Sequence, residues 1–103
     1  MPCIVTTGNY PPDKEKEVLK IFDEGMKKIP VDESISVPLG AAINVTANGI
    51  EMLSMSEVKP GKLEIALERM NRFMAMFHSI PGLRYEIKVQ MTNDEYLNSI
   101  GMG

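Results

Sequence analysis

The spacing of hydrophobic and polar residues changes along the chain between a period of two and a period near 3.6. Residues 3–7 form a short apolar and β-branched run, which is typical of a strand. Apolar residues at helical spacing follow at 13–28 and again, on one wide stripe, at 62–80. Residues 83–91 alternate strictly between apolar and polar, which predicts a strand with one buried and one solvated face.

The stretch between the two predicted helices, residues 35–58, is interpreted as two strands joined at Asn48-Gly49. Both central positions of a type I′ turn need positive φ, which Asn and Gly tolerate. A two-residue loop also determines the register of the strands that it joins. The predicted register sets these residues opposite each other: Val45 with Met52, and Asn44 with Leu53.

The order strand, helix, strand, strand, helix, strand predicts an α+β fold of the ferredoxin-like β-α-β-β-α-β type. Right-handed crossovers place both helices on one face of a four-stranded antiparallel sheet with the strand order 4-1-3-2. This order puts the second strand at an edge, where the missing N–H of Pro38 is tolerated. We expect a single domain over 1–103, with a short C-terminal tail at 93–103. Thr92-Asn93-Asp94-Glu95 resembles a capping box and predicts a turn or two of helix in that tail.

The predicted sheet has one face towards the helices and one open face. Leu53 and Met55 fall on the open side of a central strand, so a monomer would expose an apolar strip rimmed by charged residues. Burying both would stabilise an assembly by on the order of 1.5–3 kcal/mol each, although single exposed apolar residues are also common on ordinary surfaces. We therefore expect a homo-oligomer with a candidate interface of Ala42, Asn44, Leu53 and Met55. The side expected to meet the helices carries Ile43, Val45, Ile50 and Met52.

The segment Val58-Lys59-Pro60-Gly61-Lys62 leads into an amphipathic helix. Together with the strand order, it resembles the dimeric α+β barrel branch of ferredoxin-like proteins, in which two sheets pair to form a barrel. That group includes small monooxygenases, isomerases, stress proteins and many proteins of unknown role. The resemblance implies an alternative function, a small-molecule-binding protein or enzyme with a pocket between sheet and helices. It assigns no ligand residue to this chain.

Charge and composition narrow the range of partners. Eleven Lys and Arg residues against fourteen Asp and Glu give a formal charge of -3, without a block of five or more like charges. This weighs against nucleic acid and membrane partners, which require clustered cations. The open face also lacks the paired aromatic residues of an RNA-recognition domain. The start of the sequence has no signal-peptide pattern and the chain has one cysteine, so we expect a cytoplasmic protein.

Three side chains of the sequence are candidates for a chemical role. His78 and Cys3 are the only histidine and the only cysteine, so one chain cannot assemble a metal site from several such ligands. We interpret His78 as a boundary residue, Cys3 as a buried or half-buried inert thiol, and Tyr85 as a core residue. The sequence therefore predicts no metal, no cofactor and no catalytic residue, and it leaves open whether the protein is an enzyme.

Overall fold

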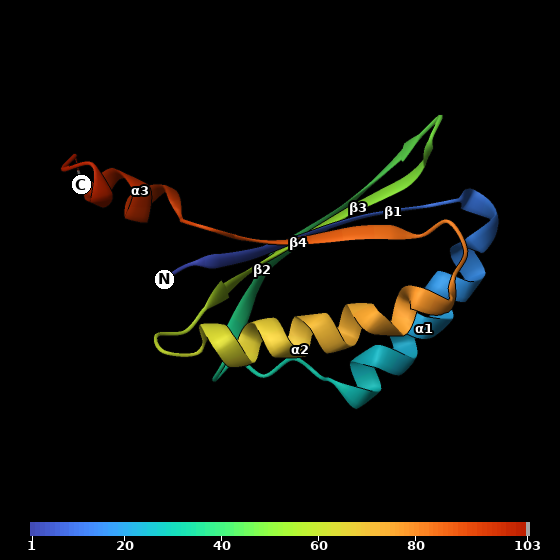
Figure 1. Cartoon of the computed structure of the whole chain (residues 1–103), viewed down its shortest axis with the longest axis horizontal. Coiled ribbons are helices and arrows are strands. Elements are labelled where there is room, and N and C mark those ends of the chain that lie inside the picture. The colour runs from blue at the N-terminus through green and yellow to red at the C-terminus, as the bar shows by residue number, and fades with distance from the viewer. Residues whose placement is uncertain (103) are drawn as a thin grey trace.

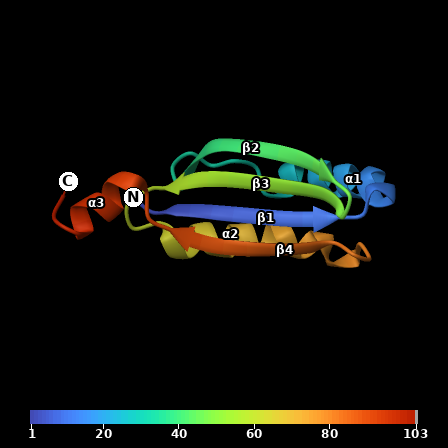
Figure 2. The same ribbon diagram turned by 90° about the horizontal axis from the view of Figure 1, so that it is seen from above.

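The computed structural model describes residues 1–102, so the last residue of the predicted tail, Gly103, lies outside the described residues. Four antiparallel strands form one sheet in the order β2-β3-β1-β4, and α1 and α2 lie on one side of it (Figures 1 and 2). Counted from the other edge, this order is 4-1-3-2, so the predicted ferredoxin-like α+β fold is confirmed. The elements are β1 (Cys3–Tyr10), η1 (Pro12–Lys14), α1 (Glu15–Lys28), β2 (Ser36–Thr46), β3 (Gly49–Val58), α2 (Leu63–Ala75), η2 (Met76–Ser79), β4 (Arg84–Gln90) and α3 (Asn93–Ser99).

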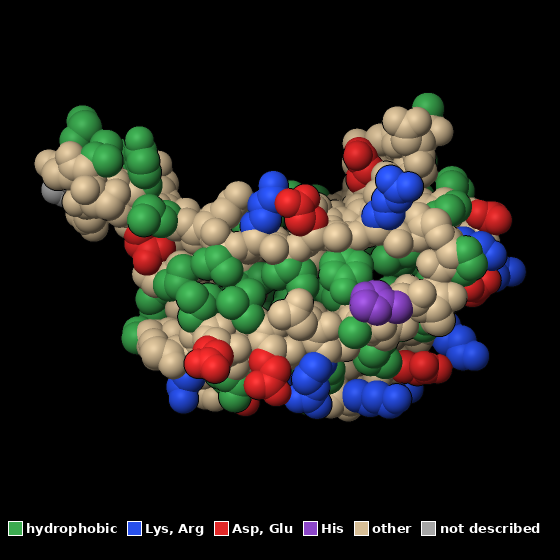
Figure 3. All heavy atoms as spheres, in the orientation of Figure 1, with side chains coloured by type: hydrophobic (Ala, Val, Ile, Leu, Met, Phe, Trp, Pro, Cys, Tyr) green, Lys and Arg blue, Asp and Glu red, His purple; other side chains and the backbone are tan. Residues whose placement is uncertain are grey.

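The buried core lies between the sheet and the helices in two neighbouring clusters. The apolar stripe predicted for the second helix is confirmed, because Ala66, Met74 and Phe77 are buried against the sheet. Hydrophobic side chains also fill the seam between the sheet and α2 on the face shown in Figure 3. The first cluster comprises Tyr10, Val18, Ile50, Met74, Phe77 and Ile80, and the second comprises Ile4, Ile35, Val58 and Ala66.

The turn of the β2–β3 hairpin lies one residue earlier than predicted. Thr46 pairs with Gly49, so the turn consists of Ala47 and Asn48. The Thr46 hydroxyl stabilises it, accepting a hydrogen bond from the Asn48 N–H at 3.1 Å and donating one to the Gly49 carbonyl at 3.1 Å. Among residues 1–102 only glycines have positive φ, which excludes a type I′ turn, and Gly49 adopts φ 128°.

This turn changes the register of the hairpin. The predicted opposite pairs were wrong, since Val45 pairs with Ile50 and Asn44 with Glu51. Each residue has moved by two positions relative to its predicted partner. Because side chains alternate with a period of two, such a shift leaves every side chain on its predicted face.

The edge strand β2 is less covered than expected. Pro38 does lie on an edge strand, next to an irregularity in the pairing between Pro38 and Gly40. Ile43 and Val45 were expected to meet the helices, but they are 70% and 71% exposed. They share the side of the sheet that carries Ile50, yet the end of the hairpin bends away from the helices (Figure 1), which leaves both side chains largely uncovered.

The C-terminal helix α3 projects from the end of the sheet (Figures 1 and 2). The predicted capping box is confirmed, with the Glu95 N–H donating to the Thr92 hydroxyl at 3.1 Å and the Thr92 N–H donating to the Glu95 carboxylate at 2.9 Å. The α-amino group of Met1 also pairs with Glu95 at 2.7 Å. No helix within residues 1–102 is long and apolar enough to cross a membrane.

Candidate functional site

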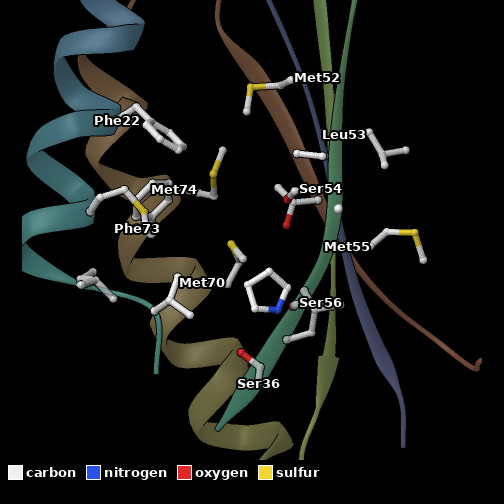
Figure 4. Close-up of a pocket in the computed structure, with 18 of the residues that line it drawn as sticks. Phe22, Ser36, Met52, Leu53, Ser54, Met55, Ser56, Met70, Phe73 and Met74 are labelled. Carbon is white, nitrogen blue, oxygen red and sulfur yellow. The ribbon is translucent and has the colours of Figure 1, made fainter. Parts of the chain in front are cut away.

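A cavity of about 580 Å³ lies between the helix-facing side of the sheet and helices α1 and α2 (Figure 4). Sites for small molecules in proteins commonly have volumes of roughly 300–1,000 Å³ and are mostly apolar with a few polar groups. This cavity has the same character, since methionine, phenylalanine and aliphatic side chains make up most of its wall. It is the candidate functional site of the protein.

Aromatic and thioether side chains form the helical wall of the cavity. Phe22 of α1 and Met70, Phe73 and Met74 of α2 extend towards the sheet (Figure 4). Phe22 and Phe73 meet edge to face, with ring centroids 5.7 Å apart and an interplanar angle of 88°, and this contact joins the two helices. Methionine side chains adapt to irregular shapes, so this wall can adjust to a bound molecule.

The sheet side of the cavity carries hydroxyl groups. Met52, Ser54 and Ser56 of β3 point towards the helices, whereas Leu53 and Met55 point away from them (Figure 4). Small serine side chains in the middle of a central strand leave space that larger apolar residues would fill. This is the local reason why the sheet and the helices enclose a cavity at this point.

Thr6 is the most buried polar residue at this site. It lies on the central strand β1, directly opposite Ser54, and its side chain is only 3% exposed. Its Oγ1 atom has no hydrogen-bond partner among the described residues. An unpaired buried hydroxyl costs about 1–3 kcal/mol, so Thr6 marks a place where a partner is missing.

The rim of the cavity is formed by α1 and the segment that leads into β2. Leu19, Phe22 and Val31 are exposed there, so the apolar stripe of the first predicted helix is only partly covered. Two charged residues lie at the cavity, Asp32 and Arg69. The Ser34 hydroxyl donates to the Asp32 carboxylate at 2.6 Å and holds the pKa of that carboxyl below its usual range. The Arg69 guanidinium donates to the Pro30 carbonyl.

The four residues of the predicted interface lie on the helix-free face of the sheet, where all of them are exposed. Leu53 and Met55 are 39% and 36% exposed at the centre of this face. Ala42 is the cross-strand partner of Leu53, and the Asn44 side chain donates to the Glu51 carboxylate at 3.4 Å. Together with Thr7 and Glu51, three of the four line a shallow hollow of about 320 Å³, while Met55 does not.

The three side chains that are candidates for a chemical role, Cys3, His78 and Tyr85, lie away from this cavity. Cys3 is a buried free thiol, and burial raises its pKa. The exposed His78 stacks on Tyr85 at 5.6 Å, and a hydrogen bond of 2.6 Å joins its Nε2 atom to the Tyr85 hydroxyl. Tyr85 itself packs against the core, as predicted. Within residues 1–102, no group of three His, Cys, Asp or Glu side chains is arranged to hold a metal ion.

Sequence reasoning missed the polar floor of the cavity. Continuing the alternation from Ile50 and Met52 would have placed Ser54 and Ser56 on the helix-facing side of their strand. Hydroxyl residues at core-facing positions were therefore a usable signal for a space inside the fold. The matching position of Thr6 on β1 was visible only once the strands were paired.

Comparison with protein-family models found no matching family, and comparison with curated proteins found no matching sequence. Solved structures do resemble the chain. One is an ACT domain protein from Streptococcus pneumoniae, with a TM-score of 0.52 and 11% identity over 86% of this chain and 89% of that one. Another is a formyltetrahydrofolate deformylase from Pseudomonas putida KT2440, with a TM-score of 0.50 and 6% identity over 85% of this chain and 28% of that one. Because the identities are so low, these similarities show the fold alone. The chain has a ferredoxin-like fold of the kind found in the ACT domain protein.

Proposed function

We propose that the cavity between the sheet and the helices binds a small, mostly apolar molecule. The observation that carries this proposal is the cavity itself, a space of about 580 Å³ with an apolar wall and a buried, unpaired hydroxyl on its floor. Filling such a space with apolar atoms is favourable by about 25 cal/mol for each Å² of apolar surface removed from water. The exposed side chains at the rim, Leu19, Phe22 and Val31, would gain cover from the same molecule.

Adjacent residues of β3 provide a matched pair of variants to test this function. The Ser54 side chain points into the cavity, while the Leu53 side chain points to the opposite face (Figure 4). Ser54→Phe should fill part of the cavity and weaken binding of the neutral fluorescent probe N-phenyl-1-naphthylamine by at least about tenfold, whereas Leu53→Phe should leave it unchanged. Circular dichroism checks that both variants are folded. Absence of probe binding to the unmodified protein, or equal binding to Ser54→Phe, would show that the cavity is not a binding site.

A second candidate function is self-association through the helix-free face, and the arrangement of this face supports it. Leu53 and Met55 form an apolar centre, flanked on β1 by Thr7 and Val5. Charged residues surround the centre, and a protein interface commonly has such an apolar core and polar rim. The rim consists of Glu51, Glu57, Arg84, Glu86 and Lys88.

The residue pairing defines a self-complementary way to join two copies. Leu53 lies in one row across the sheet with Glu86, and Met55 lies in the next row with Lys88. A two-fold axis that runs across the strands between these rows places Leu53 over Met55 of the second copy. The same axis places Glu86 over Lys88 of the second copy. One arrangement therefore brings apolar side chains against apolar side chains and opposite charges against each other.

Light scattering at micromolar concentration tests the second candidate. We expect the unmodified protein to be a homo-oligomer and Leu53→Glu to be a monomer. Ile65→Glu is the control, because Ile65 is exposed on α2, on the other side of the molecule. A monomeric unmodified protein would contradict self-association and would leave the cavity proposal unaffected.

A further inference from the structure

The polar groups of the cavity are concentrated on the sheet and not distributed around the wall. Thr6 and Ser54 are direct partners across the β1–β3 ladder, and Ser56 follows on the same face. The opposite wall, on α1 and α2, is apolar at Phe22 and Phe73. A molecule in this cavity would therefore have its apolar surface against the helices and could place a polar group against the sheet.

Thr6 requires a hydrogen-bond partner that residues 1–102 do not provide. Buried hydroxyls in folded proteins are nearly always paired with protein or with ordered solvent. The Thr6 hydroxyl can both donate and accept, so a hydroxyl or a carbonyl oxygen of a bound molecule would satisfy it. Ser54, on the neighbouring strand, offers a second hydroxyl at the same place.

Charge places a further limit on the buried part of such a molecule. Among the lining residues, only Asp32 and Arg69 carry a full charge. Asp32 is already bound to Ser34 through its N–H at 3.0 Å and its hydroxyl at 2.6 Å, and Arg69 donates to the Pro30 carbonyl. Neither charge lies on the sheet floor beside Thr6. An ionic group buried there would lose its hydration without gaining a counter-ion, which is strongly unfavourable.

We infer that the ligand is a neutral, mostly apolar molecule whose hydrogen-bonding oxygen, a hydroxyl or a carbonyl, pairs with the Thr6 side chain. This inference rests on the proposed function of the cavity and specifies the chemical class of the ligand. Thr6 acts as the residue that selects an oxygen-bearing molecule over its hydrocarbon counterpart. Ser54 supports it from the neighbouring strand.

Three matched aromatic probes test this inference: naphthalene, 1-naphthol and 1-naphthoate. We expect the unmodified protein to bind 1-naphthol about tenfold more tightly than naphthalene, which is the effect of one additional hydrogen bond in a buried site. Thr6→Val keeps the shape of the side chain and should abolish this preference, whereas Thr6→Ser should retain it. Thr7→Val removes the hydroxyl of the neighbouring residue, which faces the other side of the sheet, and should change nothing. 1-Naphthoate should bind at least about tenfold more weakly than 1-naphthol.

The outcomes separate this inference from the function on which it rests. The assigned ligand class is wrong if the preference for 1-naphthol over naphthalene is the same in the unmodified protein and in Thr6→Val. It is also wrong if the unmodified protein binds 1-naphthoate as tightly as 1-naphthol. In both cases the cavity remains a binding site. If the unmodified protein binds none of the three probes, the function of the cavity and the ligand class are both wrong. Comparing preferences between variants removes the intrinsic difference in solubility between the probes.

Discussion

Gly25 of α1 lies directly against the ring of Phe73 in α2. A Cβ atom added at Gly25 would be 2.6 Å from Cε2 of Phe73, closer than such atoms approach. Glycine at this position lets the two helices come near enough for Phe73 to make its edge-to-face contact with Phe22 at the cavity wall. Close packing of one small residue thus helps to shape the candidate site.

We expect Gly25→Ala to lower the free energy of unfolding by about 1–3 kcal/mol, the usual cost of overpacking. At an unhindered helical position the same change would be stabilising, since alanine is the better helix former. Urea denaturation measures the difference, and Glu24→Ala at the neighbouring exposed position is the control. A stabilised Gly25→Ala variant would show that the Phe73 ring moves aside without cost.

Thr6→Val should make the ligand-free protein more stable. Valine has the shape of threonine without the unpaired buried hydroxyl, so the free energy of unfolding should rise by about 1 kcal/mol. Thr7→Val, on the helix-free side of the same strand, should change it by less than about 0.5 kcal/mol. Thermal and urea unfolding of both variants give the comparison, and a loss of stability in Thr6→Val would indicate that its hydroxyl is already satisfied.

The proposed two-fold arrangement predicts a charge-reversal pattern on β4. Glu86→Lys alone and Lys88→Glu alone should each weaken the dimer by about tenfold at low salt, because each change turns two attractive contacts into repulsive ones. The double variant restores opposite charges and should dimerise like the unmodified protein. Sedimentation equilibrium measures the dissociation constants. If the double variant were as weak as the two single variants, the proposed register of the two sheets would be incorrect.

Cys3 should react slowly with thiol reagents in the native protein. Burial in β1 raises the pKa of its thiol, and the nearby Glu57 carboxylate adds to the effect, so little thiolate forms near neutral pH. We expect reaction with 5,5′-dithiobis(2-nitrobenzoate) to be at least about 100-fold slower than in denaturant. Ser79→Cys introduces an exposed thiol and should react rapidly. The pKa of the Cys3 thiol is higher in the folded protein than in the unfolded chain. The neutral thiol therefore contributes its full stabilisation at a pH below the pKa in the unfolded chain, and this contribution is lost as the pH rises through the pKa in the folded protein.

Ser34 should control the ionisation of Asp32 at the cavity rim. The Ser34 hydroxyl lowers the pKa of Asp32 below its ordinary value of 3.8, so Ser34→Ala should raise it, as measured by carboxyl NMR titration. Because the pKa of Asp32 is lower in the folded protein than in the unfolded chain, its carboxylate stabilises the fold at a pH above the pKa in the unfolded chain. This contribution is lost as the pH falls through the pKa in the folded protein. The melting temperatures of the variant and the unmodified protein should therefore differ at pH 7 and converge in acid. Glu33→Gln, at an adjacent exposed carboxyl, is the control, and an unchanged Asp32 titration in Ser34→Ala would contradict the assignment.

The fold was predictable because it depends on local and periodic features. The stripe on α2, the alternation of β4 and the capping box at Thr92 each indicated the correct element, and the order of elements left few topologies open. The exposure of Leu53 and Met55 was also predictable, because alternation along a strand determines the face of each side chain. The exact hairpin register was not predictable, since the turn lies at Ala47 and Asn48, where the Thr46 hydroxyl bonds to the Asn48 N–H and the Gly49 carbonyl.

The sequence by itself determined the class of fold and the face of the sheet on which each strand residue lies, because both follow from periodicity along the chain. Only the tertiary structure decided where the fold is hollow. The cavity lies where the small side chains of Ser54 on β3 and Thr6 on β1, paired across the sheet, face helices α1 and α2. How far a helix lies from a sheet depends on contacts between residues distant in sequence, such as Gly25 with Phe73, and no local pattern encodes that distance.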